Sequence, residues 1–363
     1  MEGLAIITDF PVSTILPGES SKFSVDNFLL SIYLLFGIIG IFANGLVLLV
    51  IVRVRSLWSI TNLFIANQSL IDLTSSIFLI LLKFLPNEVD FKGWSSTIRA
   101  FISCYFWQSD YIYWALLTCS TLNLCMLTLE RFVAVIYPVF YRSRVKWKSA
   151  LLLATAPWIT GFTFELFWPA VFRFEDDECV LDYRTPTIMA TIGVGVFLVK
   201  YVIPICIMFF VYFSILKKMR PKVETDPSAI EDNGNMQSQP TTQNQGSSSR
   251  QIRIRINILK TLFLVSVTYI VCWTPNQIIF FRFHLGGPLD FQSAQYAASV
   301  SLAFCNMWIN PFIYAFQYRK FQAGLRKLFS LNNRNESNAF SSTVPRITQN
   351  SLHVTPAIDV GRT

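Results

Sequence analysis

Charged residues are scarce in this chain. Asp, Glu, Lys and Arg make up 14% of its 363 residues, whereas a soluble domain carries about 25%. Apolar residues make up 53%, more than a soluble fold of this length can bury. The composition therefore excludes a soluble protein and indicates one whose apolar side chains are solvated by a lipid bilayer.

Histidine and the motifs of intramembrane enzymes are also lacking. The two histidines, His284 and His353, lie outside the long apolar runs, and no His-Glu-x-x-His motif, Ser/His pair or Asp pair lies within them. We therefore expect no enzyme activity. Internal repeats are absent too, which disfavours the transporters that are built from inverted repeats.

Residues 1–26 contain a single basic residue, Lys22, and no basic start followed by an apolar core. A cleaved signal peptide has both of these features. We expect the first apolar run to act as an uncleaved signal anchor.

Seven apolar runs are long enough to cross a bilayer, which takes about 20 helical residues. Three contain no charged residue, and the other four are interrupted by Asp72, Asp110, Glu165 or Lys200. The runs are 28–52, 56–82, 100–129, 149–171, 185–216, 261–281 and 291–318. The predicted fold is all-α, a seven-transmembrane helix bundle.

Basic residues gather at one end of these spans. With the N-terminus outside, 22 of the 30 Lys and Arg residues fall in cytoplasmic segments and seven in outer segments. This bias predicts a multi-pass protein of the plasma membrane with its C-terminus inside. It also accounts for the net charge of +8, so we expect no nucleic-acid partner.

The chain divides into an extracellular N-terminus (1–26), a membrane domain (27–330) and a cytoplasmic tail (331–363). Polar, low-complexity sequence predicts disorder in a cytoplasmic loop at about 221–250 and in the Ser- and Thr-rich tail. Phe321, Leu325 and Leu328 recur at helical spacing among basic residues. They predict a short amphipathic eighth helix on the lipids of the inner leaflet.

The seven cysteines separate into two groups. Five lie inside spans, where cysteine usually acts as a small buried apolar residue. The other two, Cys104 and Cys179, lie outside, in an oxidising compartment that leaves them one possible pairing. We predict a disulfide between the outer end of the third span and the second outer loop.

Asp72 lies near the middle of the second span, where a carboxyl group is costly. Polar residues lie at similar depth on other spans: Asn44, Ser120, Asn306 and Asn310. They predict a shared oxygen-rich cluster. Asp72 is either a neutral carboxyl group hydrogen-bonded to a neighbouring helix or a sodium or proton site.

Each of the seven spans carries a recognisable signature. The third ends on Glu130-Arg131-Phe132, the sixth contains Cys272-Trp273-Thr274-Pro275, and the seventh ends on Asn310-Pro311-Phe312-Ile313-Tyr314. The other four spans contain Asn44, Asp72, Trp158, and Pro204 with Tyr212. In this order and spacing, over residues 28–330, the chain resembles the rhodopsin-like G protein-coupled receptors.

The resemblance implies roles for these residues. Glu130 would hold Arg131 at rest, and activation would free Arg131 to meet a heterotrimeric G protein while Tyr212 and Tyr314 swing inward. Trp273 would lie beneath the ligand, with Tyr269 below it and Pro275 kinking the helix. Asp72, Ser120, Asn306 and Asn310 would hold an allosteric sodium ion, with no other cofactor. The tail would bind arrestin.

The chain departs from the family pattern at several positions. Glu130 replaces the usual Asp of the third span, and Tyr269 replaces the usual Phe of the sixth. Cys104 lies 27 residues before Arg131, about two more than is usual. The inner end of the sixth span contains Arg253 and Arg255 and no acid. The tail has no Cys for a palmitoyl anchor.

Receptors for biogenic amines place an Asp in the third span. That position is Tyr113 when counted from Arg131 and Tyr111 when counted from Cys104, so an amine is disfavoured, although Asp110 is only one turn higher. An opsin is excluded, because its retinal needs a Lys in the seventh span and none occurs there.

Two further residues join the tyrosines and Asp110 as pocket candidates, Lys200 and Gln277. Lys200 is the only intramembrane lysine. It either snorkels within the bundle or pairs with an acidic ligand group or with Glu165. The sequence leaves these alternatives open.

Acidic residues crowd the outer segments: Glu88, Asp90, Asp110, Glu175, Asp176, Asp177, Glu178, Asp182 and Asp290. Such a surface concentrates cations and steers basic ligands. We therefore favour a basic neuropeptide as the extracellular ligand, and the chain resembles the somatostatin, galanin and allatostatin receptors in this respect. The alternative is a lipid or a small organic ligand.

Overall fold

The computed structural model describes residues 20–84, 95–175, 178–182, 185–219, 242–290 and 293–330. Residues 1–19 and 331–363 lie outside this part, as do 220–241, so the predicted disorder falls outside it for the tail and for the loop up to residue 241. Two boundaries differ from those expected. α1 begins at Ser20, within the expected N-terminal segment, and α10 begins at Thr242, within the expected loop.

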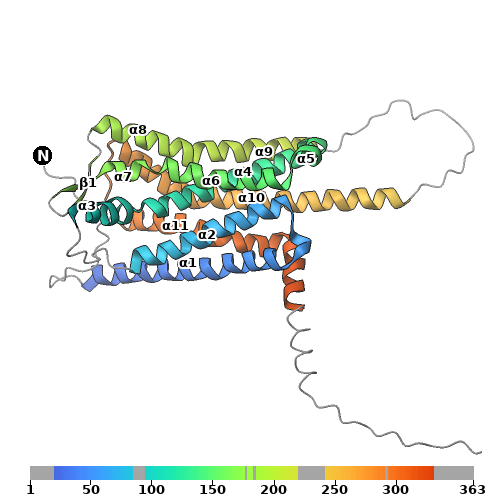
Figure 1. The fold of residues 1–363 in the computed structure, drawn as a ribbon, viewed down its shortest axis with the longest axis horizontal. Helices are drawn as coiled ribbons and strands as arrows, with labels where there is room; N and C mark the ends of the chain where they lie inside the picture. The colour runs from blue at the N-terminus through green and yellow to red at the C-terminus, as the bar shows by residue number, and fades with distance from the viewer. Residues whose placement is uncertain are drawn as a thin grey trace, which may run out of the picture.

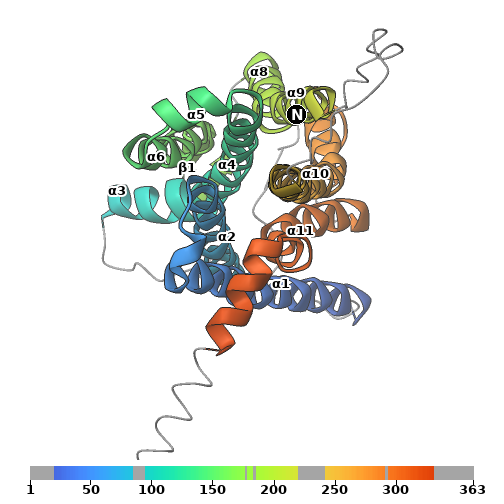
Figure 2. The same cartoon turned by 90° about the vertical axis from the view of Figure 1, so that its right-hand side faces the viewer.

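The part of the chain that the structure describes contains seven long helical rods. They lie side by side (Figure 1) and form a bundle when seen end-on (Figure 2). They are α1 (Ser20–Arg53), α2 (Ile60–Phe84), α4 (Tyr111–Ile136), α6 (Trp147–Phe164), the continuous rod α8 (Pro186–Phe197), η3 (Leu198–Val202) and α9 (Ile203–Met219), α10 (Thr242–His284) and α11 (Ala294–Gln317). The predicted all-α, seven-helix bundle is confirmed.

Six of the rods in the described part are long and apolar enough to cross a membrane by length and composition. The seventh, α11, carries no charged residue, but Asn306, Asn310 and Pro311 lower its mean hydropathy. These side chains face the interior and are buried. The polarity of α11 therefore belongs to the core of the bundle.

α4 is the central helix of the bundle. An apolar stretch of the span that contains α4 is 72% buried, whereas the corresponding stretches of the other five candidate spans are 28–44% buried. The reason is that α2, α6 and α9 all pack against α4. Large apolar side chains on the outer helices face away from the core, among them Phe42, Phe209 and Phe316 at 70–74% exposure. A bilayer is the solvent that suits them.

The outer end of the bundle is closed by α3 (Ser96–Arg99), α7 (Phe167–Val171) and an antiparallel pair of strands, β1 (Phe172–Glu175) and β2 (Glu178–Leu181). A disulfide joins Cys104 to Cys179, which lies opposite Phe174 in the sheet. The predicted pairing is confirmed. It fixes the sheet above α4.

The segment η2 (Ala100–Gln108), which carries Cys104, is π-helical. The amide of Ser109 accordingly bonds the carbonyl of Cys104, five residues earlier, at 3.2 Å. A π-helix holds more residues per turn than an α-helix. The wide turns therefore absorb the extra residues between Cys104 and Arg131, and α4 keeps its α-helical register below them.

At the inner end, η1 (Arg55–Leu57) and α5 (Pro138–Arg144) connect the rods. Residues 319–330 form the expected eighth helix, which turns across the end of the bundle (Figures 1 and 2). Its apolar side includes Phe321, 2% exposed, and Gly324, where an added Cβ would lie 2.6 Å from Leu57. Arg326 and Lys327 point outward. This alternation gives the helix the predicted amphipathic character.

A third boundary also differs from the prediction. His284 was expected outside the spans, but α10 continues to it and buries its side chain to 1% exposure. The imidazole packs 4.3 Å from the ring of Phe280 and against the small residue Gly193 of α8, where an added Cβ would clash. Close packing of α10 against Gly193 therefore buries a histidine that was expected to lie in a loop.

Candidate functional site

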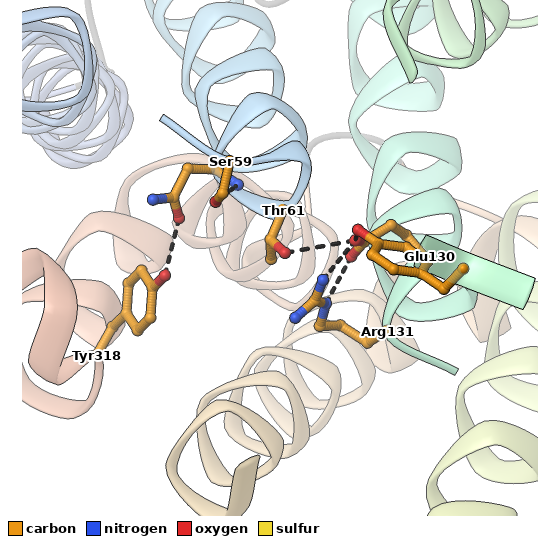
Figure 3. A network of polar contacts seen from close by, with 7 residues as sticks. Ser59, Thr61, Glu130, Arg131 and Tyr318 are labelled. Atoms are coloured by element: carbon orange, nitrogen blue, oxygen red, sulfur yellow. Dashed lines mark hydrogen bonds and ion pairs between the residues drawn. The ribbon is translucent and has the colours of Figure 1, made fainter. Parts of the chain in front are cut away.

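The first cluster of polar side chains surrounds Arg131 at the inner end of α4 (Figure 3). Arg131 donates from Nε to Glu130 Oε2 at 2.5 Å and from Nη2 to Oε1. The two side chains are 12% and 6% exposed, so salt screens their attraction weakly. Beside them Tyr318 donates to Asn62 at 2.9 Å and ties the end of α11 to α2.

Two residues that the sequence did not single out complete this cluster. Tyr141 of α5 donates a hydrogen bond to Glu130 Oε1, and Thr61 of α2 donates to the same atom at 3.4 Å. Burial, together with the hydrogen bond to Glu130, raises the pKa of Tyr141, so its hydroxyl stays protonated. Pro138 at the start of α5 was the only sequence signal for the helix that positions Tyr141.

Tyr212 and Tyr314 are not assembled with Arg131. The ring of Tyr212 stacks on Phe263 of α10 with the ring centroids 4.6 Å apart. Tyr314 is 1% exposed, and its hydroxyl has no hydrogen-bond partner among the described residues. The structure therefore holds Arg131 on its neighbouring glutamate, and we refer to this as the closed arrangement.

A second cluster lies halfway along the bundle around Asp72, which is fully buried. Ser120 donates to Asp72 Oδ1 at 2.8 Å, and Asn310 donates to Oδ2 at 3.2 Å. The Asn44 amide donates to the carbonyl of Met307 at 2.9 Å instead of to the carboxyl group. Helices α2, α4 and α11 thus meet at Asp72, and α1 joins α11 beside it.

Gln68 and Asn123 belong to this cluster and were missed from the sequence. Gln68 Nε2 lies 3.1 Å from both carboxylate oxygens of Asp72 and 2.5 Å from Ser120. Asn123 donates to Gln68 Oε1 at 2.8 Å. The available signal was the spacing, since Gln68 lies four residues before Asp72 and therefore on the same helix face.

The cluster offers oxygen atoms to a small cation. The side-chain oxygens of Asn306 and Asn310 are buried without a hydrogen-bond donor among the described residues, and Asn310 is hydrogen-bonded to the Asp72 carboxylate. Oxygen ligands are those that hard cations prefer. The donor set fits sodium, but the Gln68 amide already donates to both carboxylate oxygens and would compete with the ion.

Trp273 and the residues around it form a buried layer in α10. Trp273 is 2% exposed and Tyr269 is 0% exposed, with their ring centroids 6.2 Å apart. Pro275 lies within α10 just above, and Gln277 is 3% exposed. The indole Nε1 of Trp273 has no acceptor among the described residues.

Tyr113 and Tyr111 are the two candidates for the position in the third span where amine receptors have an Asp, and they have different surroundings. Tyr113 is 3% exposed and meets Phe304 of α11 edge to face at 5.4 Å, inside the bundle. Tyr111 donates to the carbonyl of Phe162 in α6 at 2.9 Å. Counting from Arg131 therefore identifies the interior residue. Asp110, at the break between η2 and α4, has a left-handed backbone with φ of 53°.

Lys200 pairs with Glu165. Its Nζ lies 2.8 Å from Glu165 Oε1, and the two side chains are 4% and 0% exposed. The sequence left three alternatives open for Lys200, and in the structure it pairs with Glu165.

An apolar groove of about 470 Å³ lies elsewhere, at the outer end of the bundle. Its lining residues are Phe101, Tyr105, Phe106, Tyr111, Leu166, Pro169 and Ala170. Phe101 and Leu166 are more than half exposed, so the groove opens outward and contains only one of the predicted pocket residues.

The described acids at the outer end are partly compensated. Arg173 pairs with Glu175 at 3.0 Å and with Asp182 at 3.2 Å, and all three side chains are substantially exposed. Asp290 is also exposed. Glu88, Asp90, Asp176 and Asp177 lie outside the described residues.

The chain matches one family model. Residues 43–314 match the model described as "7 transmembrane receptor (rhodopsin family)". The match covers all seven rods in whole or in part, and it includes the Asp72 cluster together with Arg131, Glu130, Tyr141 and Thr61.

Individual relatives are similar at low identity. The chain is 23% identical over 321 residues to the octopamine receptor beta-2R of Chilo suppressalis, which covers 80% of this chain and 76% of that one. It is 25% identical to the allatostatin-A receptor of Bombyx mori (80% and 76% covered) and 24% identical to galanin receptor 2b of Danio rerio (82% and 74% covered). These relatives include receptors named for an amine and receptors named for peptides.

Proposed function

Because this chain belongs to the rhodopsin family of seven-transmembrane receptors, we propose that it binds a basic neuropeptide outside the cell and activates a heterotrimeric G protein inside it. The observation that carries the coupling proposal is the Arg131 cluster. Arg131 lies at the inner end of the central helix and is held by its neighbour Glu130. A rearrangement of the helices can therefore release it.

The closed arrangement supplies the resting state of this mechanism. Glu130, which accepts a hydrogen bond from Tyr141, holds Arg131 against α4, while Tyr212 is stacked on α10. Outward movement of the inner half of α10 would separate Tyr212 from Phe263. Arg131 would then leave Glu130 and meet the G protein, which binds only the open state and therefore shifts the population toward it.

We place the receptor in the plasma membrane with its N-terminus outside. The excess of Lys and Arg in the inner segments supports this orientation. The disulfide between Cys104 and Cys179 lies at the opposite end, which is where an oxidising compartment is required.

The peptide assignment is supported by what fills the amine position. Tyr113 packs on Phe304 there, and no carboxylate takes its place. Acidic residues such as Asp290 are exposed at the outer end and would attract a basic chain. The similarity to receptors named for allatostatin-A and galanin is in keeping with this ligand class.

A lipid or a small organic ligand is the second candidate. The outward-facing apolar groove at Tyr111 and Leu166 is the observation that favours it. An amine would have to bind Asp110, one turn above Tyr113. Because the chain is similar to an octopamine receptor, amines are included among the ligands to be tested.

Two further partners are part of the proposal. A sodium ion at Asp72 and Asn310 would supply a positive charge that favours the closed arrangement. Phosphorylated Ser and Thr residues of the tail would bind arrestin through their added charge.

The test is a ligand screen in which the Arg131→Ala variant serves as the negative control. Cells that express the chain with a promiscuous G protein reporter are exposed to libraries of basic peptides, biogenic amines and lipids. A true ligand should activate the wild type and fail to activate Arg131→Ala, which should still bind it at matched surface expression. Full signalling by Arg131→Ala would refute the proposed coupling, and a response to amines or lipids alone would refute the peptide assignment.

A further inference from the structure

An ion pair is buried between three helical rods in the outer half of the bundle. Glu165 caps the end of α6, Lys200 lies in η3, and Nζ and Oε1 are 2.8 Å apart. Lys200 Nζ also lies 4.9 Å from the ring centre of Trp114 in α4. Both charges are expensive to keep inside a membrane, and the pair, the ring and a hydroxyl donor offset that cost.

A small residue brings Glu165 into this position. At Gly161, one turn earlier in α6, an added Cβ would lie 2.5 Å from Cys119 Sγ and 3.1 Å from the carbonyl of Ala115. The two helices therefore touch at this point. Their close approach lets Glu165 Oε1 accept a hydrogen bond from Thr118 of α4 as well as from Lys200.

The backbone of Lys200 connects the pair to α10. In a π-helical segment the backbone bonds run to the fifth residue along, which leaves carbonyls open to other donors. The Lys200 carbonyl accepts the hydroxyl of Tyr269, a fully buried residue of α10. Where the family usually has Phe, this chain therefore has a hydroxyl, and it is used to bind η3.

Four rods are thus joined through two residues. Glu165 fixes the side chain of Lys200, and the backbone of Lys200 holds Tyr269, which lies beside Trp273. The same structure keeps Arg131 on Glu130, so these contacts belong to the closed arrangement.

We propose that the Glu165–Lys200 ion pair is a positioning device that sets the resting activity of this receptor, by holding η3 in the geometry that binds Tyr269 and keeps α10 closed. The inference rests on the proposed receptor function. It adds a residue pair and a route by which the outer half of the bundle controls α10.

The first experiment measures ligand-independent signalling at matched surface expression. Lys200→Met removes the charge and keeps the length of the side chain, and Tyr269→Phe removes only the hydroxyl. Each should raise basal signalling by about tenfold, which corresponds to about 1.4 kcal/mol in the closed–open equilibrium. Where Lys200→Met does not reach the surface, Glu165→Gln/Lys200→Met takes its place, because it leaves no unpaired buried charge.

A double-mutant cycle separates this route from general loosening. Tyr269→Phe added to Lys200→Met should raise signalling no further, because both break one chain of contacts. The matched control is Tyr201→Phe, which removes another hydroxyl bond between η3 and α10, that of Tyr201 to Thr274 at 2.6 Å. Its effect should add to that of Lys200→Met. Additive effects of Tyr269→Phe, or wild-type basal signalling by Tyr269→Phe, would overturn the proposal.

The second experiment does not depend on a G protein. Spin labels on cysteines introduced at Lys148 of α6 and Lys260 of α10, both exposed, report the distance between these helices. Lys200→Met should lengthen it. A lengthened distance without any reporter signal would leave the positioning device standing and reject the proposed coupling. An unchanged distance would reject the device itself.

Discussion

Replacing Glu130 by Gln tests how firmly Arg131 is held. The substitution keeps the shape of the side chain and removes its charge. The carboxylate receives two hydrogen bonds from Arg131 and one from Tyr141. A hydrogen bond to a charged group contributes about 1.5–3 kcal/mol, and exposures of 12% and 6% leave little screening.

Loss of one such contribution from the closed arrangement should raise the open-to-closed ratio by about 10- to 150-fold. The assay is ligand-independent loading of a GTP analogue in membranes with equal receptor density. Tyr141→Phe removes one hydrogen bond from the same carboxylate, which keeps both bonds from Arg131. We expect a loss at the low end of this range, about 1.5 kcal/mol, or a rise of about tenfold. Thr61→Val removes only the long contact of 3.4 Å and should leave the rate near wild type.

The reasoning depends on this order of effects. Basal loading by Glu130→Gln that equals wild type would show that the contact with Arg131 does not hold the bundle closed. A rise with Thr61→Val as large as that with Tyr141→Phe would show that helix packing, and not the hydrogen bonds of Glu130, controls the equilibrium.

Three further predictions concern the outer, central and inner parts of the bundle. Cys104→Ser and Cys179→Ser should each impair surface expression or ligand binding, with no added loss in the double variant; additive losses would mean that the two are not partners in cells. Sodium should weaken agonist binding to the wild type, Asp72→Asn should erase the effect, and Gln68→Leu should enlarge it by freeing the carboxylate; a sodium response that survives in Asp72→Asn would put the ion elsewhere. Arg255→Glu should lower basal signalling by supplying the acid that the inner end of the sixth span lacks, and unchanged basal signalling at equal surface expression would show that the missing acid has no effect.

The helices of the bundle could be predicted from the sequence because a membrane span is a matter of length and hydropathy. Their ends could not, since α1 and α10 extend into polar sequence at Ser20 and Thr242. The wide turns of η2 were visible only as an unusual count of residues between Cys104 and Arg131. Which helical geometry absorbs extra residues depends on the disulfide and the sheet that hold them.

The candidate site could be predicted where polar residues lie at the same depth in the membrane spans. It could be predicted less well where the partner of a side chain depends on how the helices pack. Asp72, Ser120 and Asn310 are brought together, but Gln68 was not singled out from the sequence although it contacts Asp72 directly. The partner of Lys200 could not be chosen from the sequence. The choice depends on a close approach of α4 and α6 that only three-dimensional packing reveals.

The π-helical turns of η2 also bear on how such a receptor can diversify. One residue inserted into an α-helix rotates everything beyond it by about 100° and shifts it by about 1.5 Å. Here the added length is taken up above Asp110, so the lower part of α4 is spared that rotation. Ancestral insertions at the mouth could therefore reshape ligand recognition without re-aiming Arg131. The mouth of the bundle and the segment that carries Arg131 are thereby free to evolve at different rates.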